Sequence, residues 1–194
     1  MEKSPRLNFN GVTALLVEGD RHSVSLLSEI LRRFGLDNQY CVETGAEAKA
    51  HMQRITVDFF FCEAVLPDMD GLDLVRWVRR SAPVPYIPVV VLTGYSRVDA
   101  VVGARDAGAN LVVKKPLSPQ VLFDRLAWMG LGTRKFIETE TYVGPDRRFK
   151  SIGPPDGLGR RSTDLSQDVG QATEPNMTQA EIDAMMKPTK LAST

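Results

Sequence analysis

The sequence has few of the residues that mark disulfide-rich, metal-binding or membrane proteins. Its 194 residues include only two cysteines and two histidines, and these four side chains have no metal-ligand spacing. Two cysteines fit a reduced compartment, so we expect a cytoplasmic protein. No apolar run approaches the roughly 20 residues of a membrane span. Residues 1–10 lack the apolar core of a secretory signal, so none is expected.

Neither sign of charge is in excess. The 24 lysines and arginines cancel the 24 aspartates and glutamates, so bulk charge predicts no attraction to nucleic acid or to an anionic membrane. The length leaves room for one ordinary domain and an extension. A nucleic-acid-binding adaptor that uses local basic residues stays open as an alternative, although no folded DNA-binding motif is visible.

Residues 11–129 alternate between strand-like and helix-like segments. Short apolar runs predict strands at 12–17, 38–42, 58–62, 87–92 and 111–113. Apolar residues at helical spacing predict helices at 21–34, 45–53, 71–80, 97–107 and 119–129. Five such units predict an α/β fold with a five-stranded, parallel, doubly wound sheet covered by helices on both faces. Ligand sites in such sheets lie at the carboxyl ends of the strands.

Polar motifs follow four of these strands. They are Val-Glu-Gly-Asp at 17–20, Leu-Pro-Asp-Met-Asp-Gly at 66–71, Leu-Thr-Gly at 92–94 and Lys-Pro at 115–116. Their order and spacing resemble the receiver domain of response regulators, which has the CheY-like, flavodoxin-like fold. The resemblance implies an Asp nucleophile that accepts a phosphoryl group, two acidic residues that hold Mg²⁺, and a Thr or Ser and a Lys that contact the phosphoryl group.

This chain departs from that pattern at three positions. Glu63 replaces the Asp nucleophile, Gly19 replaces the second acidic residue beside Glu18, and Val112 replaces an aromatic residue of the family. The carboxylate of Glu63 lies one methylene further out, and a misplacement near 1 Å can cost on the order of 10²-fold in rate. We therefore expect a degenerate receiver that binds no metal and is not phosphorylated in the usual way.

The degenerate phosphorylation pocket is expected to contain Glu18, Asp20, Glu63, Thr93 and Lys115. Two interpretations of Glu63 stay open. In one, its carboxylate reaches Lys115 and Thr93 and mimics the phosphorylated state. In the other, Glu63 is a polar residue in an inert pocket.

The segment 142–164 holds two arginine pairs on either side of a spacer. Seven of the sixteen residues at 144–159 are Gly or Pro, so we expect the free segment to be disordered. Guanidinium groups fit phosphate oxygens and the O6/N7 edge of guanine, and a carboxylate accepts from guanine N–H groups. The segment thus predicts a ligand with several guanines and phosphates, such as cyclic di-GMP, either alone or as an intercalated dimer. A solvated basic linker is the alternative.

The residues from Arg161 to Asp164 resemble the Arg-x-x-Asp product-inhibition site of diguanylate cyclases, which binds this ligand. Aromatic residues of the segment are candidates to stack on or cover the bases, although packing on the receiver is as good an interpretation for Phe149. The candidate contacts are Tyr142, Asp146, Arg147, Arg148, Phe149, Arg160, Arg161, Ser162 and Asp164.

A degenerate receiver followed by an arginine-rich segment resembles the Cle family of CheY-like cyclic di-GMP effectors. The resemblance implies a non-enzymatic, monomeric adaptor that binds cyclic di-GMP and engages the flagellar motor switch protein FliM. It would tune motility and surface attachment and be recruited to the flagellated pole. We expect a receiver at 1–134, a nucleotide-binding segment at 135–170 and a flexible tail at 171–194. A phosphorylation-dependent response regulator, in which Glu63 is compensated, is the alternative.

Residues 177–187 predict a short helix in that tail. Thr178 and Glu181 have capping-box spacing. A small apolar face is formed by Ile182, Met185 and Met186. The stretch resembles the short N-terminal motif of FliM that docks on CheY. Two interpretations stay open: the helix docks on the receiver and is displaced by a partner, or it is a simple tail helix.

Overall fold

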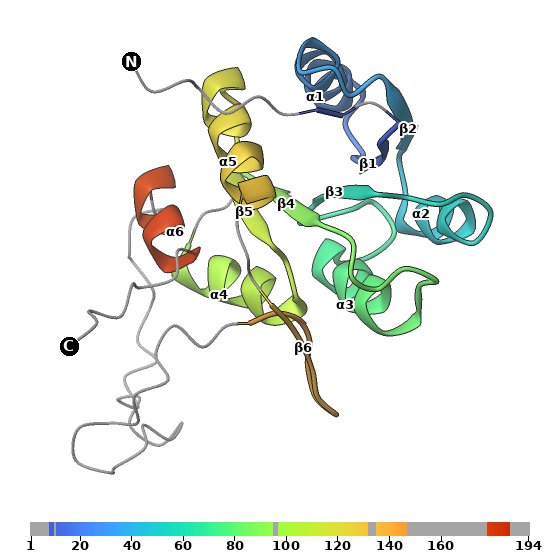
Figure 1. Ribbon diagram of the computed structural model, residues 1–194, viewed down its shortest axis with the longest axis vertical. Coiled ribbons are helices and arrows are strands. Elements are labelled where there is room, and N and C mark those ends of the chain that lie inside the picture. The colour runs from blue at the N-terminus through green and yellow to red at the C-terminus, as the bar shows by residue number, and fades with distance from the viewer. Residues whose placement is uncertain (1–7, 10, 95–96, 132–134, 147–177, 187–194) are drawn as a thin grey trace.

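The computed structural model describes residues 8, 9, 11–94, 97–131, 135–146 and 178–186. Its main sheet has five parallel strands in the order β2-β1-β3-β4-β5 (Figure 1). The strands are β1 (Thr13–Val17), β2 (Asn38–Val42), β3 (Phe59–Glu63), β4 (Val89–Thr93) and β5 (Leu111–Lys114). The connecting helices are α1 (Arg21–Arg33), α2 (Gly45–Met52), α3 (Gly71–Ser81), α4 (Val98–Ala107) and α5 (Pro119–Leu131). The predicted fold is confirmed.

The sheet separates two apolar cores because successive strand residues point to opposite faces. On β3, Phe60 belongs to a cluster with residues of α2, α3 and α4, and Phe61 belongs to a cluster with residues of α1 and α5. The helices therefore cover both faces of the sheet. Of the sheet itself, only the strand ends and the edges are therefore left uncovered by these helices.

The chain beyond α5 differs from the prediction. β6 (Phe136–Glu138) and β7 (Val143–Pro145) form an antiparallel hairpin, so the expectation that the segment from Tyr142 lacks regular structure is wrong for its first residues. The hydroxyl of the buried Tyr142 donates to the Pro145 carbonyl at 2.7 Å and closes the end of the hairpin. Gly144 is required there, because a Cβ at this position would lie 2.5 Å from the Tyr142 hydroxyl.

The hairpin is attached to the receiver body by polar contacts. Arg80 on α3 donates to the Thr141 carbonyl at 2.9 Å, and the Tyr86 hydroxyl donates to Glu138 at 2.8 Å. The described contacts with the receiver body therefore include residues beyond 134.

The last described element is α6 (Gln179–Met186), which packs beside β5 (Figure 1). The predicted capping box is confirmed: the Thr178 N–H donates to the Glu181 carboxylate at 2.6 Å, and the Glu181 N–H donates to the Thr178 hydroxyl at 3.3 Å. Ile182 is fully buried in the core cluster that α4 helps to form. The structure shows α6 docked on the receiver, as one of the two interpretations expected, and its displacement by a partner stays a prediction.

Candidate functional site

The predicted pocket forms at the carboxyl ends of the strands. Glu18 directly follows β1, Glu63 ends β3, and Lys115 directly follows β5. Because parallel strands end at the same edge of a sheet, these residues converge although they lie far apart in sequence. The ammonium group of Lys115 forms ion pairs with the carboxylates of both Glu18 and Glu63.

Backbone groups hold the three side chains in place. The Ala64 N–H donates to the second oxygen of Glu63 at 3.1 Å, and the Asp20 N–H donates to the second oxygen of Glu18 at 3.1 Å. The backbone N–H of Lys115 donates to the carbonyl of the buried Thr93 at 2.8 Å. Both carboxylates are thus held from two sides, by the lysine and by the main chain.

The pocket contains one ammonium group for two buried carboxylates. Burial raises the pKa of Glu63, and its pairing with Lys115 only partly offsets that rise. Burial by itself would lower the pKa of Lys115, but its bonds to Glu18 and Glu63 outweigh burial and raise that pKa above the ordinary lysine value. The lysine is therefore firmly charged, and protonation of Glu63 would relieve the excess negative charge.

The donor set does not fit a Mg²⁺ site in this conformation. Lys115 lies between the two carboxylates that would have to face the ion. Asp20 is the N-cap of α1: it accepts from the Ser23 N–H at 2.7 Å, and this bond lowers the pKa of Asp20. Among the described residues, no group of three or more His, Cys, Asp or Glu side chains is placed to hold a metal.

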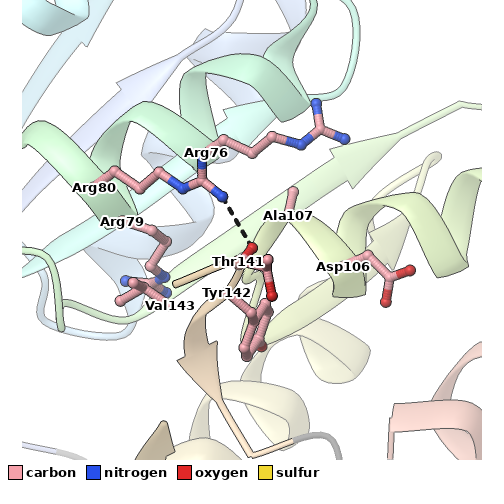
Figure 2. A pocket seen from close by; sticks show the side chains of 8 residues that line it. All are labelled: Arg76, Arg79, Arg80, Asp106, Ala107, Thr141, Tyr142 and Val143. Carbon is pink, nitrogen blue, oxygen red and sulfur yellow. Dashed lines mark hydrogen bonds between the residues drawn. The ribbon is translucent and has the colours of Figure 1, made fainter. Parts of the chain in front are cut away.

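A second polar site lies where the hairpin meets α3 and the end of α4 (Figure 2). Its cavity of about 60 Å³ is too small for a nucleotide, since ligand pockets usually measure about 300–1,000 Å³. The cavity is lined by Arg76, Arg79, Arg80, Asp106, Ala107, Thr141, Tyr142 and Val143. These side chains support the hairpin.

Arg79 anchors this region, and sequence reasoning did not single it out. Its buried guanidinium donates to the Gly108 carbonyl at 2.9 Å, to the Ile87 carbonyl at 2.7 Å and to the Asn110 side chain at 2.8 Å. It also lies 5.1 Å from the centre of the Phe136 ring of the hairpin. Burial lowers the pKa of Arg79 to about 10. The helical pattern of α3 could have identified this arginine, because Arg79 lies four residues after the buried Val75 and so on the apolar face, whereas Arg76 and Arg80 are exposed.

The structure places two of the predicted nucleotide contacts. The ring of Tyr142 is buried within the hairpin, which does not fit the expected stacking role. Asp146 follows β7, and its N–H donates to the Lys135 carbonyl at 2.8 Å. The remaining predicted contacts lie outside the described residues: Arg147, Arg148, Phe149, Arg160, Arg161, Ser162 and Asp164.

Within the described part of the chain, no helix combines the length and the apolar character needed to cross a membrane.

Known proteins resemble the α/β part of the chain. The family model of the response regulator receiver domain matches residues 14–127. The transcriptional regulatory protein GltR of Pseudomonas aeruginosa is 31% identical over 121 residues, which is 62% of this chain and 49% of GltR. The chemotaxis protein CheY of the same organism is 30% identical over 101 residues, which is 52% of this chain and 82% of CheY. The match thus spans about half the length of GltR.

Solved structures agree. A putative response regulator from Chloroflexus aurantiacus superposes with a TM-score of 0.57 at 28% identity, covering 61% of this chain and 97% of the other. The hairpin and α6 lie beyond the end of the family match at residue 127.

Proposed function

Because the chain belongs to the response regulator receiver family, we propose that it is a non-enzymatic signalling adaptor whose input is a nucleotide bound by its arginine-rich segment. The observation that carries this proposal is the pairing of Lys115 with both Glu18 and Glu63. The side chain at the acceptor position is thereby already engaged with the lysine that the family resemblance assigns to the phosphoryl group.

Phosphoryl transfer to Glu63 would have to overcome this arrangement. The residue is only 8% exposed, so a donor has little access to its carboxylate. Transfer would also separate Glu63 from Lys115 and leave the buried Glu18 to share the lysine with a new, more highly charged group. The ion pair supports the interpretation in which Glu63 takes the place of the phosphorylated acceptor and holds the pocket in one charged state.

The proposed input is cyclic di-GMP. The arginine pairs Arg147-Arg148 and Arg160-Arg161 follow closely after β7, whose hairpin is fixed to α3, so the segment starts from an anchored point. Arginine forks suit phosphates and guanine edges, and Asp146 and Asp164 supply the carboxylate acceptors. Several charge-assisted bonds of about 1.5–3 kcal/mol each give sub-micromolar affinity after the cost of ordering the segment.

The proposed output is binding to the flagellar motor switch protein FliM, which tunes motility and surface attachment and brings the protein to the flagellated pole. Support comes from the relatives, since matching proteins include chemotaxis proteins of Pseudomonas aeruginosa and Vibrio cholerae. The adaptor acts as a monomer in the cytoplasm.

The experiment is calorimetric titration of the full-length protein with cyclic di-GMP. We expect sub-micromolar binding, with at least a tenfold loss in Arg147→Ala and in Arg161→Ala. Arg33→Ala is the matched control, because it removes an exposed arginine of α1 outside the segment and should bind as the wild type does. Absence of binding at tens of micromolar to the wild type would refute the nucleotide input.

A phosphorylation-dependent response regulator is the second candidate, and the retained Thr93 and Lys115 favour it. Incubation with acetyl phosphate and Mg²⁺, followed by phosphate-affinity electrophoresis, separates the two proposals. The adaptor proposal expects the wild type to run as Glu63→Ala does. A shifted band in the wild type that hydroxylamine removes, as it does an acyl phosphate, and that is missing in Glu63→Ala would establish phosphoryl uptake.

A further inference from the structure

β2 is an edge strand of the main sheet, because the strand order ends there (Figure 1). The opposite edge, β5, is covered by α6, since the side chain of Gln179 accepts from the Lys114 N–H at 2.6 Å. Proteins usually block an open edge with charged side chains or proline, and Asn38–Val42 contains neither. β2 is therefore the edge of this sheet to which a further strand can be added.

The backbone groups that face this edge can be identified from one hydrogen bond. The Glu18 N–H donates to the Val42 carbonyl at 3.1 Å, so the N–H and C=O groups of Val42 point toward β1. Because backbone groups alternate in direction along a strand, those of Tyr40 also point toward β1, whereas those of Gln39 and Cys41 point outward. The open edge thus presents two donors and two acceptors, one of each on either side of Tyr40.

These groups match those of a second copy of the strand that runs in the opposite direction. When Tyr40 of each copy lies on a two-fold axis, Gln39 of one copy lies opposite Cys41 of the other, and each such pair exchanges two hydrogen bonds. The two Tyr40 side chains, each 38% exposed in the single chain, then meet as a cross-strand aromatic pair. The edge is therefore complementary to itself in the register centred on Tyr40.

The charges at the ends of β2 fit the same register. Asp37 and Glu43 flank the strand and are exposed, and Asp37 of one copy would lie opposite Glu43 of the other. Arg21 donates through Nε to Glu43 at 2.8 Å, and its side chain is 87% exposed. Since a guanidinium has further N–H donors, Arg21 can bridge Glu43 and the Asp37 of the second copy. Each end of the paired strands then holds one cation between two carboxylates.

We propose that the β2 edge binds a second copy of this chain by antiparallel pairing centred on Tyr40, which joins the two sheets into one. The contact is short, and interfaces that bury little surface are transient, so we expect a dissociation constant on the order of 100 µM. The chain is then a monomer when dilute and a dimer where it is concentrated. The inference goes beyond the proposed function and depends neither on cyclic di-GMP nor on FliM.

Disulfide trapping in the full-length chain tests the register. Tyr40→Cys in a Cys41→Ser background puts the two sulfurs on a non-hydrogen-bonded pair, whose Cα atoms lie about 4.5 Å apart and so within reach of a disulfide. Asn38→Cys in the same background is the matched control, because it is equally exposed but would lie about 14 Å along the strand from its counterpart. The remaining Cys62 is fully buried.

After oxidation with copper phenanthroline, non-reducing electrophoresis should show a covalent dimer for Tyr40→Cys and only monomer for Asn38→Cys. The wild type should also stay monomeric on the gel, because in this register the two Cys41 residues are offset by two residues, about 7 Å, along the strand in addition to the distance between strands. No covalent dimer from Tyr40→Cys, or equal amounts from both variants, would overturn the proposal.

Sedimentation equilibrium tests the pairing without a cross-link. The dimer of the wild type should grow with concentration, and Arg21→Glu should abolish it, because three carboxylates then meet at each end of the paired strands. Adding Asp37→Arg to Arg21→Glu should restore the dimer, since the charges are then exchanged across the contact, and restoration shows that the variant is folded. A wild type that stays monomeric well above the expected dissociation constant, or a dimer that does not respond to Arg21→Glu, would contradict the pairing.

Discussion

At the residue scale, Lys115 determines what the strand-end pocket can do. Its single charge is shared by two carboxylates that are both largely withdrawn from water. Removing one partner of a buried pair typically costs about 3–5 kcal/mol, because the other charge is left uncompensated. The lysine is therefore needed to keep Glu18 and Glu63 in the fold, whatever signal the pocket carries.

The shifted pKa of Glu63 leads to a pH prediction. Burial raises that pKa in the folded chain above the ordinary value of 4.5. As the pH rises through 4.5, the unfolded chain loses this proton first, so the free energy of unfolding falls until the folded pKa is passed. Lys115, whose pKa is raised above 10.5, contributes stability that is lost only above that pH and does not alter this window.

We expect Glu63→Gln to remove this fall from the stability curve. Urea unfolding at a series of pH values from about 4 to about 8 measures it. The groups that face Glu63 are Lys115, Glu18 and the Ala64 N–H, and the variant leaves all three in place. Glu140→Gln changes an exposed glutamate and serves as the control. Matching slopes in wild type and Glu63→Gln would contradict the prediction.

At the element scale, the β6–β7 hairpin and the end of α4 are fitted to each other. Gly108 ends α4 in the left-handed conformation with φ of 103°. A Cβ at Gly108 would lie 2.7 Å from the Val143 carbonyl of β7 and 2.9 Å from the Arg79 side chain. The helix terminus therefore needs glycine both for its conformation and for the close approach of the hairpin.

A pair of substitutions separates these two effects. Gly35 also has a left-handed φ, 88°, but a Cβ there would meet nothing within 4 Å. We expect Gly35→Ala to cost about 1–2 kcal/mol for the conformation alone. Gly108→Ala should cost a further ~1–3 kcal/mol, because the backbone of β7 must move. Chemical denaturation measures both, and equal losses would show that the hairpin is not packed as described.

At the scale of the whole molecule, the receiver and the hairpin form one packed unit, and the helix α6 returns to it from beyond residues 147–177. The arginine pairs lie between these two attachments in the sequence. In the proposed function, the input segment is thus bounded on one side by an anchored hairpin and on the other by a helix that covers an edge of the sheet.

Two truncated chains check this division. A chain that ends at Asp146 should melt cooperatively, close to the full-length protein, and bind no cyclic di-GMP. A chain that ends at residue 134 lacks Phe136, whose ring lies over Arg79, and the buried Tyr142. Its melting temperature should be roughly 5 °C lower than that of the chain ending at Asp146, because each kcal/mol of lost stability lowers the melting temperature by ~2–4 °C. Calorimetry measures both, and a shorter chain of equal stability would show that the hairpin adds nothing to the fold.

The strands, the helices and the α6 capping box were predictable because their signals are local. A short apolar run such as Phe59–Phe61 favours a strand by its own residues, and Thr178 meets Glu181 within a single turn. The motifs at the strand ends predicted that Glu18, Glu63 and Lys115 meet, because parallel strands end at one edge. The sequence by itself therefore determined the fold class, the meeting of these three residues and the loss of the aspartate.

Tertiary structure decided how those residues are used. That Lys115 bonds to both carboxylates, that Arg79 is buried on carbonyl groups, and that Tyr142 faces inward are outcomes of contacts between segments distant in sequence. The docking of α6 on β5 is of the same kind, since Gln179 and Lys114 lie 65 residues apart in the sequence. Such contacts depend on the free energy of burial at a shared surface. A local sequence pattern does not specify which distant segment will form the other side of that surface.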